Sequence, residues 1–543
     1  MDIDLATAWE IVSDALPDRD AIVQGDRRLT YRAFEETAAR FATAIELAGV
    51  EEGGKVALYL YNSPEYMLGE FGAFKHRAIP VNVNYRYLDD ELAYLLDNSD
   101  AEVLVFHRSL GDRVGRVRDR LSNLRLLVEV DDSAHAGGTQ LDGVIPFDEL
   151  VASHAPQARK TRSGRDISMT YTGGTTGMPK GVMSRQGAYV DGIYRASAQL
   201  LDLPAAPAAP DEIATLVQQL QTSGRGVAMP CCPLMHATGL GICAIPTLLR
   251  GGTLVLLEQR TFDPHEVWTQ VERERVAVIV IVGDAFARPM LRALEERQRD
   301  GRPYDTSSIT DLISAGTIWS AEVKDALATH LSARLIDMLG STEGGIYAVS
   351  SANRAAHVAT ARFSLSMGAR VLTEDGSDVV PGSGEQGLIA SPSNAIGYFK
   401  DPEKSARTFR EIDGQSYVLT GDWATVELDG SITLLGRGSN CINSGGEKVF
   451  PEEVEEAVKR HPDVDDCLVV GMPDERFGQR VVAVVGAATV RRPTEDELRE
   501  WLRPSLAHYK IPRSFIVLDA VRRAPNGKAD YGWAREEASA RHV

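Results

Sequence analysis

The chain of 543 residues lacks features that would place it in several common classes of protein. Its five cysteines are an odd number without Cys-x-x-Cys spacing, so the sequence indicates neither a cysteine zinc site nor a disulfide framework. No apolar run approaches the roughly 20 residues that cross a bilayer. The N-terminus also lacks the basic flank and apolar core of a signal peptide. We therefore expect a cytoplasmic protein with reduced thiols and no transmembrane segment, while peripheral contact with a membrane stays open.

The chain has fewer basic than acidic residues, and its formal net charge is −19 at pH 7. Such an acidic balance disfavours broad binding to nucleic acid or to anionic lipid headgroups. Hydrophobic residues make up 43% of the chain and charged residues 25%, which is ordinary for a folded globular protein. The length allows about three or four domain-sized units. We therefore expect a multidomain protein whose partners are small molecules.

A loop rich in glycine and threonine lies between Tyr171 and Met183. Its residues of interest are Thr172, Gly173, Gly174, Thr175, Thr176, Gly177 and Lys180. Glycines let backbone N–H groups converge on phosphate oxygens, and the lysine can neutralise part of the phosphate charge. The loop is not a Walker motif, because no glycine stands five residues before a Gly-Lys-Ser/Thr triplet. The pattern predicts a phosphate-binding loop, with a plain flexible turn as the alternative.

Short buried strands alternate with helical patterns along most of the chain, which predicts a parallel α/β architecture. Segments 21–24 and 28–31 read as a hairpin, residues 212–220 as an amphipathic helix, and residues 131–165 as a polar stretch with no assigned element. The sequence pattern changes beyond Arg437, and the remaining residues predict a separate compact unit of about a hundred residues. Its expected helices begin at Pro451 and at Glu495, the second running to about Leu506. The chain therefore divides into a large α/β part and a small α+β part.

Several short motifs carry groups suited to a nucleotide, although each has a structural alternative. Ala315-Gly316 is a small-residue turn at a strand end, and Gly340-Ser341-Thr342-Glu343 combines hydroxyls with a carboxylate that Mg²⁺ could use. Asp422 and Arg437 could bind ribose hydroxyls, or form a surface ion pair. Taken alone, His236 reads as a structural histidine and Lys528 as a solvated lysine. The motifs gain meaning from their joint occurrence.

In their order along the chain these motifs resemble the adenylate-forming superfamily of acyl-CoA synthetases, carrier-protein adenylation domains and luciferases. The resemblance covers nearly the whole chain. It is strongest to actinobacterial fatty-acid and steroid-side-chain CoA ligases, through Thr-Gly-Gly-Thr-Thr-Gly and Asn-Ser-Gly-Gly-Glu-Lys-Val. It implies an N-terminal adenylation domain of several subdomains, residues 1–439, and a small mobile lid domain, residues 440–543, hinged near Asn440.

The resemblance also implies a role for each motif. ATP, Mg²⁺ and CoA are the expected cofactors, and a carboxylic acid is the substrate. Segment 172–180 would hold the β- and γ-phosphates. The remaining roles would fall to Thr342 (α-phosphate), Glu343 (Mg²⁺), Gly340 and Ser341 (nucleotide), Asp422 and Arg437 (ribose), Ala315, Gly316 and Asp337 (adenine), His236 (acyl pocket), Gly445 and Gly446 (pantetheine path) and Lys528 (substrate carboxylate and α-phosphate).

The expected reaction needs no general base, because an ionised carboxylate attacks the α-phosphorus of ATP, and a thiol then takes the acyl group from the adenylate. Three positions depart from the family pattern: Gly174 replaces a serine, Leu339 an aromatic residue and Asn440 an aspartate or lysine. We predict an acyl-CoA synthetase for a hydrophobic acid. The alternatives are another acyl acceptor, a luciferase-type oxidation and a non-catalytic nucleotide-binding regulator. The oligomeric state is open, with a homodimer as one option.

Overall fold

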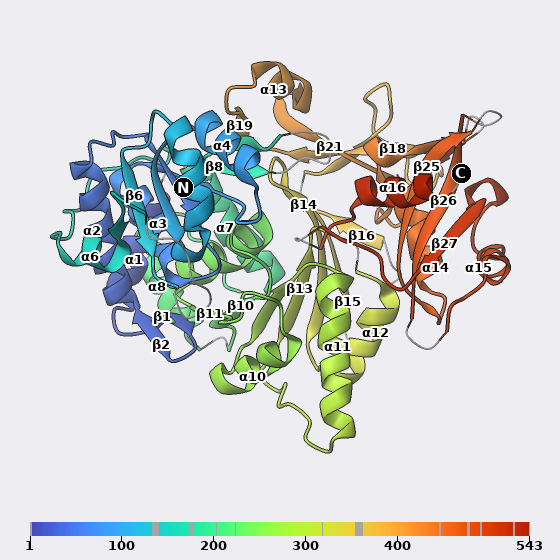
Figure 1. The fold of residues 1–543 in the computed structure, drawn as a ribbon, viewed down its shortest axis with the longest axis horizontal. Helices are drawn as coiled ribbons and strands as arrows, with labels where there is room; N and C mark the ends of the chain where they lie inside the picture. The colour runs from blue at the N-terminus through green and yellow to red at the C-terminus, as the bar shows by residue number, and fades with distance from the viewer. Residues whose placement is uncertain are drawn as a thin grey trace.

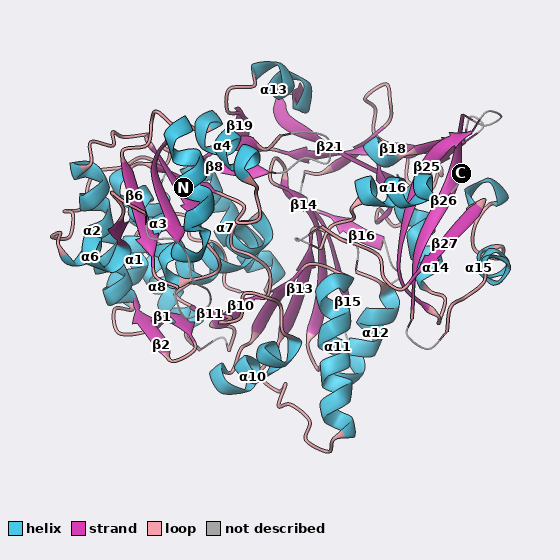
Figure 2. Cartoon of the chain, in the orientation of Figure 1, coloured by secondary structure: helices cyan, strands magenta, loops and turns pink. Residues whose placement is uncertain are grey.

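The computed structural model describes residues 3–132, 141–172, 178–201, 203–222, 224–317, 319–352, 362–366, 368–444, 447–474, 478–488, 491–524 and 527–541. These ranges form the mixed α/β architecture that the sequence predicts (Figures 1 and 2). Every helix within them is too short or too polar to cross a lipid bilayer.

A 14-stranded sheet runs through the large part of the molecule. Its parallel strands, in spatial order, are β1 (Asp20–Gln24), β11 (Thr253–Leu256), β10 (Val227–Pro230), β12 (Val278–Ile281), β13 (Asp311–Ala315) and β14 (Arg334–Ser341). Every residue of β11, β12 and β13 is buried, because parallel strands of this kind are covered on both faces. The expected hairpin is confirmed, since β2 (Arg27–Thr30) pairs antiparallel with β1 at the sheet edge.

Helices cover this sheet in two groups (Figure 1). The first group surrounds the N-terminal helix and comprises α1 (Leu5–Ala15), α2 (Tyr31–Leu47), α3 (Pro64–His76), α7 (Gln186–Leu200), α8 (Glu212–Leu220), the π-helical segment η3 (Thr238–Ala244) and α9 (Ile245–Leu249). The second comprises α10 (Pro264–Glu274), α11 (Asp284–Arg299) and α12 (Ala321–His330). The core between them buries Trp9, Trp268 and Trp319 completely. Burial of these large side chains, together with the many aliphatic residues around them, stabilises the core.

A second sheet of five parallel strands lies beside the first group of helices. Its strands are β4 (Ile79–Asn82), β3 (Lys55–Tyr59), β5 (Ala101–His107), β6 (Leu126–Val130) and β7 (Ile145–Pro146), and its helices are α4 (Asp89–Asn98), α5 (Gly111–Val117) and α6 (Phe147–Ala152). The sequence analysis missed β7 and α6 in the polar stretch 131–165. Phe147 and Leu150 are buried there, but two apolar residues are too few to make a periodic signal.

The large sheet continues past β14 with antiparallel strands. These are β15 (Gly345–Ala352), β16 (Arg362–Leu365), β22 (Ile432–Arg437), β21 (Gln415–Val426), β18 (Gln386–Pro392) and β17 (Arg370–Leu372), with β20 (Phe409–Ile412) against β21. A separate three-stranded sheet consists of β8 (Ile167–Thr172), β9 (Lys180–Arg185) and β19 (Ala395–Tyr398), followed by the short helix α13 (Pro402–Thr408). This sheet carries the two ends of the predicted phosphate loop.

The C-terminal part has its own five-stranded sheet and two hydrophobic clusters of its own, and it lies at the right of Figure 1. Its elements are β23 (Ile442–Ser444), β24 (Glu447–Val449), α14 (Pro451–Lys459), β25 (Val464–Asp474), β26 (Gly478–Ala487), α15 (Glu495–Leu502), β27 (Ser514–Leu518) and α16 (Tyr531–Ala540). The expected helix from Glu495 is confirmed, but its end near Leu506 is wrong. Pro504 has no N–H to continue the helical hydrogen bonds, so the helix ends at Leu502.

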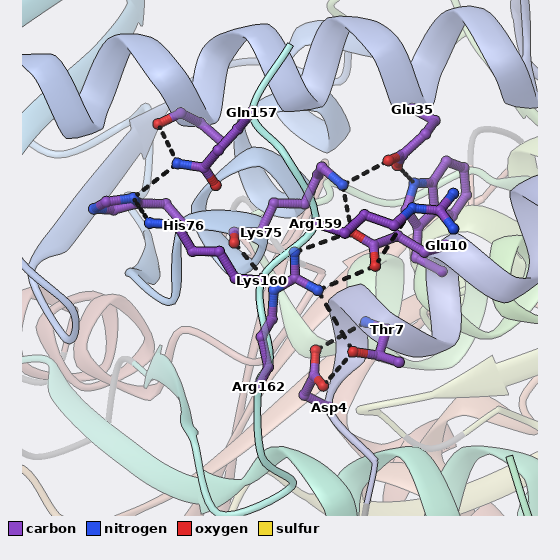
Figure 3. A network of polar contacts seen from close by, with 12 residues as sticks. Asp4, Thr7, Glu10, Glu35, Lys75, His76, Gln157, Arg159, Lys160 and Arg162 are labelled. Atoms are coloured by element: carbon purple, nitrogen blue, oxygen red, sulfur yellow. Dashed lines mark hydrogen bonds and ion pairs between the residues drawn. The ribbon is translucent and has the colours of Figure 1, made fainter.

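A network of buried charges joins α1, α2, α3 and the segment that leads into β8 (Figure 3). The Lys75 ammonium lies 2.5 Å from a carboxylate oxygen of both Glu10 and Glu35, and its side chain is 1% exposed. Arg162 donates to Glu10 over 3.0 Å, and Trp9 donates to Glu35 over 2.7 Å. Burial opposes ionisation of Glu10, but Arg162 and Lys75 hold its pKa below the ordinary value. The network therefore fixes α3 against its neighbours through charges that compensate one another.

Candidate active site

A cavity of about 1420 Å³ lies where the parallel strands of the large sheet end, and it extends along the sheet beneath α7. Ligands of parallel α/β sheets bind in this position, outside the carboxyl ends of the strands. Residues from distant parts of the sequence meet in its wall. The predicted site residues among them are Thr172, His236, Ala315, Gly316, Gly340, Ser341, Thr342, Glu343, Arg437 and Lys528. The fold thus brings ten of the predicted positions to one cavity.

The two ends of the predicted phosphate loop are held by the β8–β9 pair, in which Thr172 lies opposite Lys180. The predicted residues Gly173, Gly174, Thr175, Thr176 and Gly177 lie outside the described residues. Thr172 is in the cavity wall, whereas the Lys180 ammonium forms an ion pair with Asp401, the residue that caps α13. Asp401 keeps a lowered pKa chiefly through this lysine. A phosphate that binds Lys180 must therefore compete with a carboxylate.

The turn between β14 and β15 presents Thr342 and Glu343 to the cavity. Gly340 is required there, because a Cβ atom at this position would lie 2.8 Å from the carbonyl oxygen of Gly345. The Glu343 carboxylate accepts a hydrogen bond of 2.7 Å from the Tyr398 hydroxyl, whose pKa is raised by burial and by that carboxylate. Ser393 donates to the Glu343 carbonyl oxygen over 2.7 Å. The carboxylate is thus oriented from both its side chain and its backbone.

The predicted ribose-binding pair is brought together by the register of two strands. Asp422 of β21 lies directly opposite Arg437 of β22, and the arginine Nε donates to Asp422 Oδ1 over 3.0 Å. The other oxygen of Asp422 accepts a hydrogen bond from the buried Tyr347 hydroxyl. Asp422 raises the pKa of Arg437, so the guanidinium stays charged. Arg437 lines the cavity while Asp422 lies behind it, so the carboxylate orients the arginine.

The predicted adenine-side residues separate into two groups. Ala315 and Gly316 line the cavity, and Gly316 has a φ of 95°, a conformation that favours glycine. Asp337 does not line the cavity. Its buried carboxylate lies 3.3 Å from the Lys324 ammonium, and burial raises its pKa to about 6. Leu339 likewise packs into the cluster around β15 and β16, on the side of β14 away from the cavity.

His236 follows β10 and opens the helical segment η3, since its carbonyl oxygen accepts the Leu240 N–H over 3.0 Å. Its imidazole is in the cavity wall, and its buried Nε2 has no hydrogen-bond partner among the described residues. Burial, with a smaller contribution from Lys528 and Arg86, lowers the pKa of His236 to about 4. The ring is therefore neutral at physiological pH and suits an acyl group better than it suits a phosphate.

Lys528 enters the cavity from the C-terminal part of the chain. The preceding Gly527 has a φ of 78° and lies so close to β12 and α11 that a Cβ atom there would be 3.2 Å from Ala285 and 3.4 Å from Val282. Burial and the nearby Arg437 lower the pKa of Lys528, while Glu343 and Asp422 act in the opposite sense. The lysine therefore shares one electrostatic environment with the predicted nucleotide residues.

The C-terminal part contacts the large part at further points. Arg292 of α11 forms a 2.6 Å ion pair with Asp465 of β25, and the Arg437 N–H lies 3.5 Å from Glu452 of α14. Within the C-terminal part, Asn440 donates a hydrogen bond to Glu452. The predicted Gly445 and Gly446 lie outside the described residues. These contacts join the C-terminal part to the large part while Lys528 lines the cavity.

Sequence reasoning missed Tyr398, Asp401, Tyr347 and Arg86, which support or neighbour the predicted residues. Each lies far along the chain from its partner, and no local motif marks it. Their contacts depend on how distant strands and loops pack together, which the pattern of one sequence does not specify.

Comparisons with known proteins agree with this geometry. A family model described as "AMP-binding enzyme" matches residues 9–399, and "AMP-binding enzyme C-terminal domain" matches residues 453–528. A curated relative from Mycolicibacterium smegmatis, the medium/long-chain-fatty-acid–CoA/3-oxocholest-4-en-26-oate–CoA ligase, is 40% identical over 99% of this chain and 96% of its own length. The 3-oxocholest-4-en-26-oate–CoA ligase of Rhodococcus rhodochrous is 39% identical over 100% and 97%.

Solved structures share the fold. A crystal structure of an anthranilate CoA ligase in complex with anthranoyl-AMP matches with a TM-score of 0.83 at 24% identity, over 98% of this chain and 97% of that one. A benzoate CoA ligase from Burkholderia xenovorans matches with a TM-score of 0.80 at 22% identity, over 98% and 100%. The large N-terminal part and the small C-terminal part are thus common to these proteins.

Proposed function

Because this chain belongs to the AMP-binding enzymes and is an acyl-CoA synthetase by its relatives, we propose that it activates a hydrophobic acid of the fatty or steroid-side-chain type. ATP and CoA are its co-substrates, and the acid forms an acyl adenylate before the acyl group passes to the thiol of CoA. One observation carries the proposal about the acid. The wall of the cavity that holds the predicted nucleotide residues also contains a set of apolar side chains, which includes Phe74, Leu240, Ile242, Ile245 and Val349.

The adenylation step follows from the charges around the cavity. The substrate carboxylate attacks the α-phosphorus, the bond to the bridging oxygen breaks, and pyrophosphate leaves. Lys528 would lie between the carboxylate and the α-phosphate, reducing the repulsion between two anions and stabilising the charge that develops in the transition state. Thr342 would bind the α-phosphate. His236, neutral and buried, would line the acyl pocket and take no part in proton transfer.

The nucleotide would be bound by residues on both sides of the cavity mouth. Arg437, held by Asp422, would bind the ribose, and Ala315 with Gly316 would border the adenine. The segment 172–180 would hold the β- and γ-phosphates. Asp337 is the weakest of the predicted contacts, because its carboxylate is already paired with Lys324 and lies outside the cavity wall.

Glu343 would hold Mg²⁺ together with the phosphates of ATP, which would supply charge neutralisation for the leaving pyrophosphate. Among the described residues no group of three or more His, Cys, Asp or Glu side chains could hold a metal ion. A single carboxylate in the cavity wall suits Mg²⁺, because this ion commonly takes one or two protein carboxylates and completes its shell with phosphates and water. The chemistry of the available donors therefore fits a cation that arrives with the nucleotide.

Thioester formation would need a second arrangement of the C-terminal part. While Lys528 occupies the cavity, the CoA thiol has to approach the same adenylate. We propose that residues 440–543 act as a lid that rotates near Asn440, with Gly445 and Gly446 bordering the pantetheine path and residues 1–439 as the fixed domain. The backbone of a few residues can absorb such a rotation. The proposal extends to a cytoplasmic enzyme, with homodimerisation and peripheral membrane contact as additional possibilities to measure.

The proposed activity is tested by incubating the protein with ATP, Mg²⁺, CoA and a panel of fatty, aryl and steroidal acids. AMP and acyl-CoA are measured together, and both should appear with the hydrophobic acids. Adenylate without thioester would favour a different acyl acceptor. Nucleotide binding without turnover across the panel would contradict the proposal and favour a regulator. Omission of Mg²⁺ tests the cation, since turnover should then fall while CoA binding persists.

A further inference from the structure

The apolar region of the cavity contains one acidic side chain without a partner. Glu70 of α3 is in the cavity wall and is 5% exposed. Among the described residues, no side chain or backbone group forms a hydrogen bond or ion pair with its carboxyl group, and burial alone raises its pKa to about 8. A buried polar group without a partner is costly, so its retention calls for a ligand that completes it.

Unlike Glu70, the other charged residues that the structure describes in the cavity wall each have an interaction partner. Arg250 donates to Ser197 over 2.7 Å, and Asp191 pairs with Arg195 over 2.6 Å. Glu343 and Arg437 have the partners described above, and Lys528 also has an interaction partner. Among the charged residues that the structure describes in the cavity wall, Glu70 is therefore the one without a hydrogen bond or ion pair.

A second polar group stands close to Glu70 in the same wall. The Tyr189 hydroxyl on α7 is near enough for Glu70 to raise its pKa, and it has no hydrogen bond among the described residues. Gly241 faces it, because a Cβ atom at Gly241 would lie 2.9 Å from the Tyr189 oxygen. A glycine at this position leaves room beside the hydroxyl. Helices α3 and α7 thus contribute a carboxyl group and a phenol that lie near each other in the cavity wall.

The Glu70 carboxyl group and the Tyr189 hydroxyl lie farther from Lys528 than His236 does. Lys528 contributes to the pKa of His236, which precedes η3, but not to the pKa of Glu70 or of Tyr189, which faces Gly241 of η3. A group that meets Tyr189 and Glu70 therefore sits in the body of the acid, away from its carboxylate. A plain hydrocarbon chain would leave the Glu70 carboxyl group and the Tyr189 hydroxyl without hydrogen bonds. A ketone oxygen at that depth could accept a hydrogen bond from either group, and a hydroxyl could accept from one and donate to the other.

We propose that Glu70 and Tyr189 form a docking point for a hydroxyl or ketone oxygen carried on the hydrophobic body of the acid. This inference rests on the proposed function and narrows its substrate class from hydrophobic acids in general to oxygenated ones. Glu70 and Tyr189 act as specificity-determining residues, and the reacting atoms are not in contact with them. The network around Lys75 fixes the helix that carries Glu70, so the carboxyl group has a defined position (Figure 3).

The test uses pairs of acids with the same carbon skeleton, one unsubstituted and one with a single hydroxyl or ketone, the oxygen being moved along the skeleton in the series. For the native enzyme, kcat/KM for acyl-CoA formation should favour the oxygenated acid by roughly tenfold or more at the matching position, because the unsubstituted acid leaves buried polar groups unpaired. In Glu70→Leu the preference should disappear or reverse. Glu70→Gln should largely keep it, because an amide also donates and accepts.

Tyr66→Phe is the matched control. The Tyr66 hydroxyl is as buried as Glu70, lies near it and has no hydrogen-bond partner, but it is not in the cavity wall. This variant should leave the preference between the paired acids unchanged. If Glu70→Leu does not fold, Tyr189→Phe carries the same comparison and should reduce the preference.

Equal kcat/KM for both members of every pair in the native enzyme, or an equal loss for both in Glu70→Leu, would overturn the docking point. In either case thioester formation would still support the proposed function. Failure of every acid to give AMP and thioester would instead contradict the proposed function itself. The two failures are therefore distinguishable in one set of measurements.

Discussion

Replacement of Lys528 by alanine should separate the two half-reactions. At an effective dielectric constant of about 20, two unit charges 4 Å apart interact by about 4 kcal/mol, which corresponds to a factor of about 10³ in rate. Lys528 lines the cavity near Arg437, Glu343 and Asp422, and its side chain is exposed to solvent until the acid and ATP cover it, which is the state in which this estimate applies. Loss of one preorganised donor to a developing oxyanion typically lowers kcat by 10²–10³, about the same amount. We therefore expect Lys528→Ala to slow adenylation about 10²- to 10³-fold.

The assay measures each half-reaction by itself. Pyrophosphate release in the absence of CoA reports adenylation, and acyl-CoA formation from supplied acyl adenylate reports the second step. Lys528→Ala should slow the first strongly and change the second less than about tenfold, because the lysine has to leave before the thiol enters. Lys510→Ala is the control, since Lys510 lies in the same C-terminal part but pairs with Glu453 over 2.6 Å and does not line the cavity.

Equal losses in both half-reactions would refute the reasoning that Lys528 serves adenylation alone. A loss in Lys510→Ala comparable with that in Lys528→Ala would show that the C-terminal part had been destabilised as a whole. Thermal unfolding of the three proteins, measured alongside, separates this case from a specific effect.

Three further predictions follow from the charges of the cavity and the interior. The rate of adenylation should fall at alkaline pH with a midpoint below pH 10.5. Burial and Arg437 lower the pKa of Lys528, and its ammonium is lost as the pH rises through that pKa. A pH profile of pyrophosphate release without CoA measures the midpoint, and a value above 10.5 would contradict the prediction. Lys75→Met should lower the free energy of unfolding by about 3–5 kcal/mol, because the variant leaves Glu10 in a buried site with less positive charge around it. Urea unfolding measures the change, and a loss under about 1 kcal/mol would contradict the prediction. Asp422→Asn should raise the KM for ATP about tenfold and leave the preference among acids unchanged, because Arg437, the proposed ribose contact, loses its charged partner. An unchanged KM for ATP would argue against the assignment of Asp422 and Arg437 to the ribose.

Much of the fold can be predicted from the sequence, because the hydrophobic periodicity and the turn residues of many segments agree with the final structure. The helix at 212–220 coincides with α8, and the hairpin near the N-terminus is β1–β2, since both have regular hydrophobic periods and clear turn residues. The element at 147–152 was missed because its polar sequence carries only two buried apolar residues. The helix from Glu495 ends at Leu502, four residues before the predicted end near Leu506, because Pro504 cannot continue the helical hydrogen bonds.

The candidate site was predictable as a set of motifs but not as a set of contacts. Glu343 and Arg437 stand in motifs, and both reach the cavity. Tyr398 stands in no motif, yet it orients Glu343 because β19 and the β14–β15 turn meet in space. The family resemblance implies a place beside adenine for Asp337, whereas its carboxylate pairs with Lys324 and does not line the cavity. Such contacts are set by tertiary packing, which a single sequence does not report.

The charged network around Glu10 has a consequence for the order in which the chain can fold during synthesis. Domains generally fold from the N-terminus as the chain emerges. Glu10 is buried by α1–α3, yet two of its three cationic partners, Arg159 and Arg162, are synthesised about 150 residues later. Until those arginines arrive, the helical layer holds two acids against the single ammonium of Lys75. We therefore expect nascent chains shorter than residue 162 to remain loosely packed, and the segment before β8 to act as the closing step for the whole N-terminal layer.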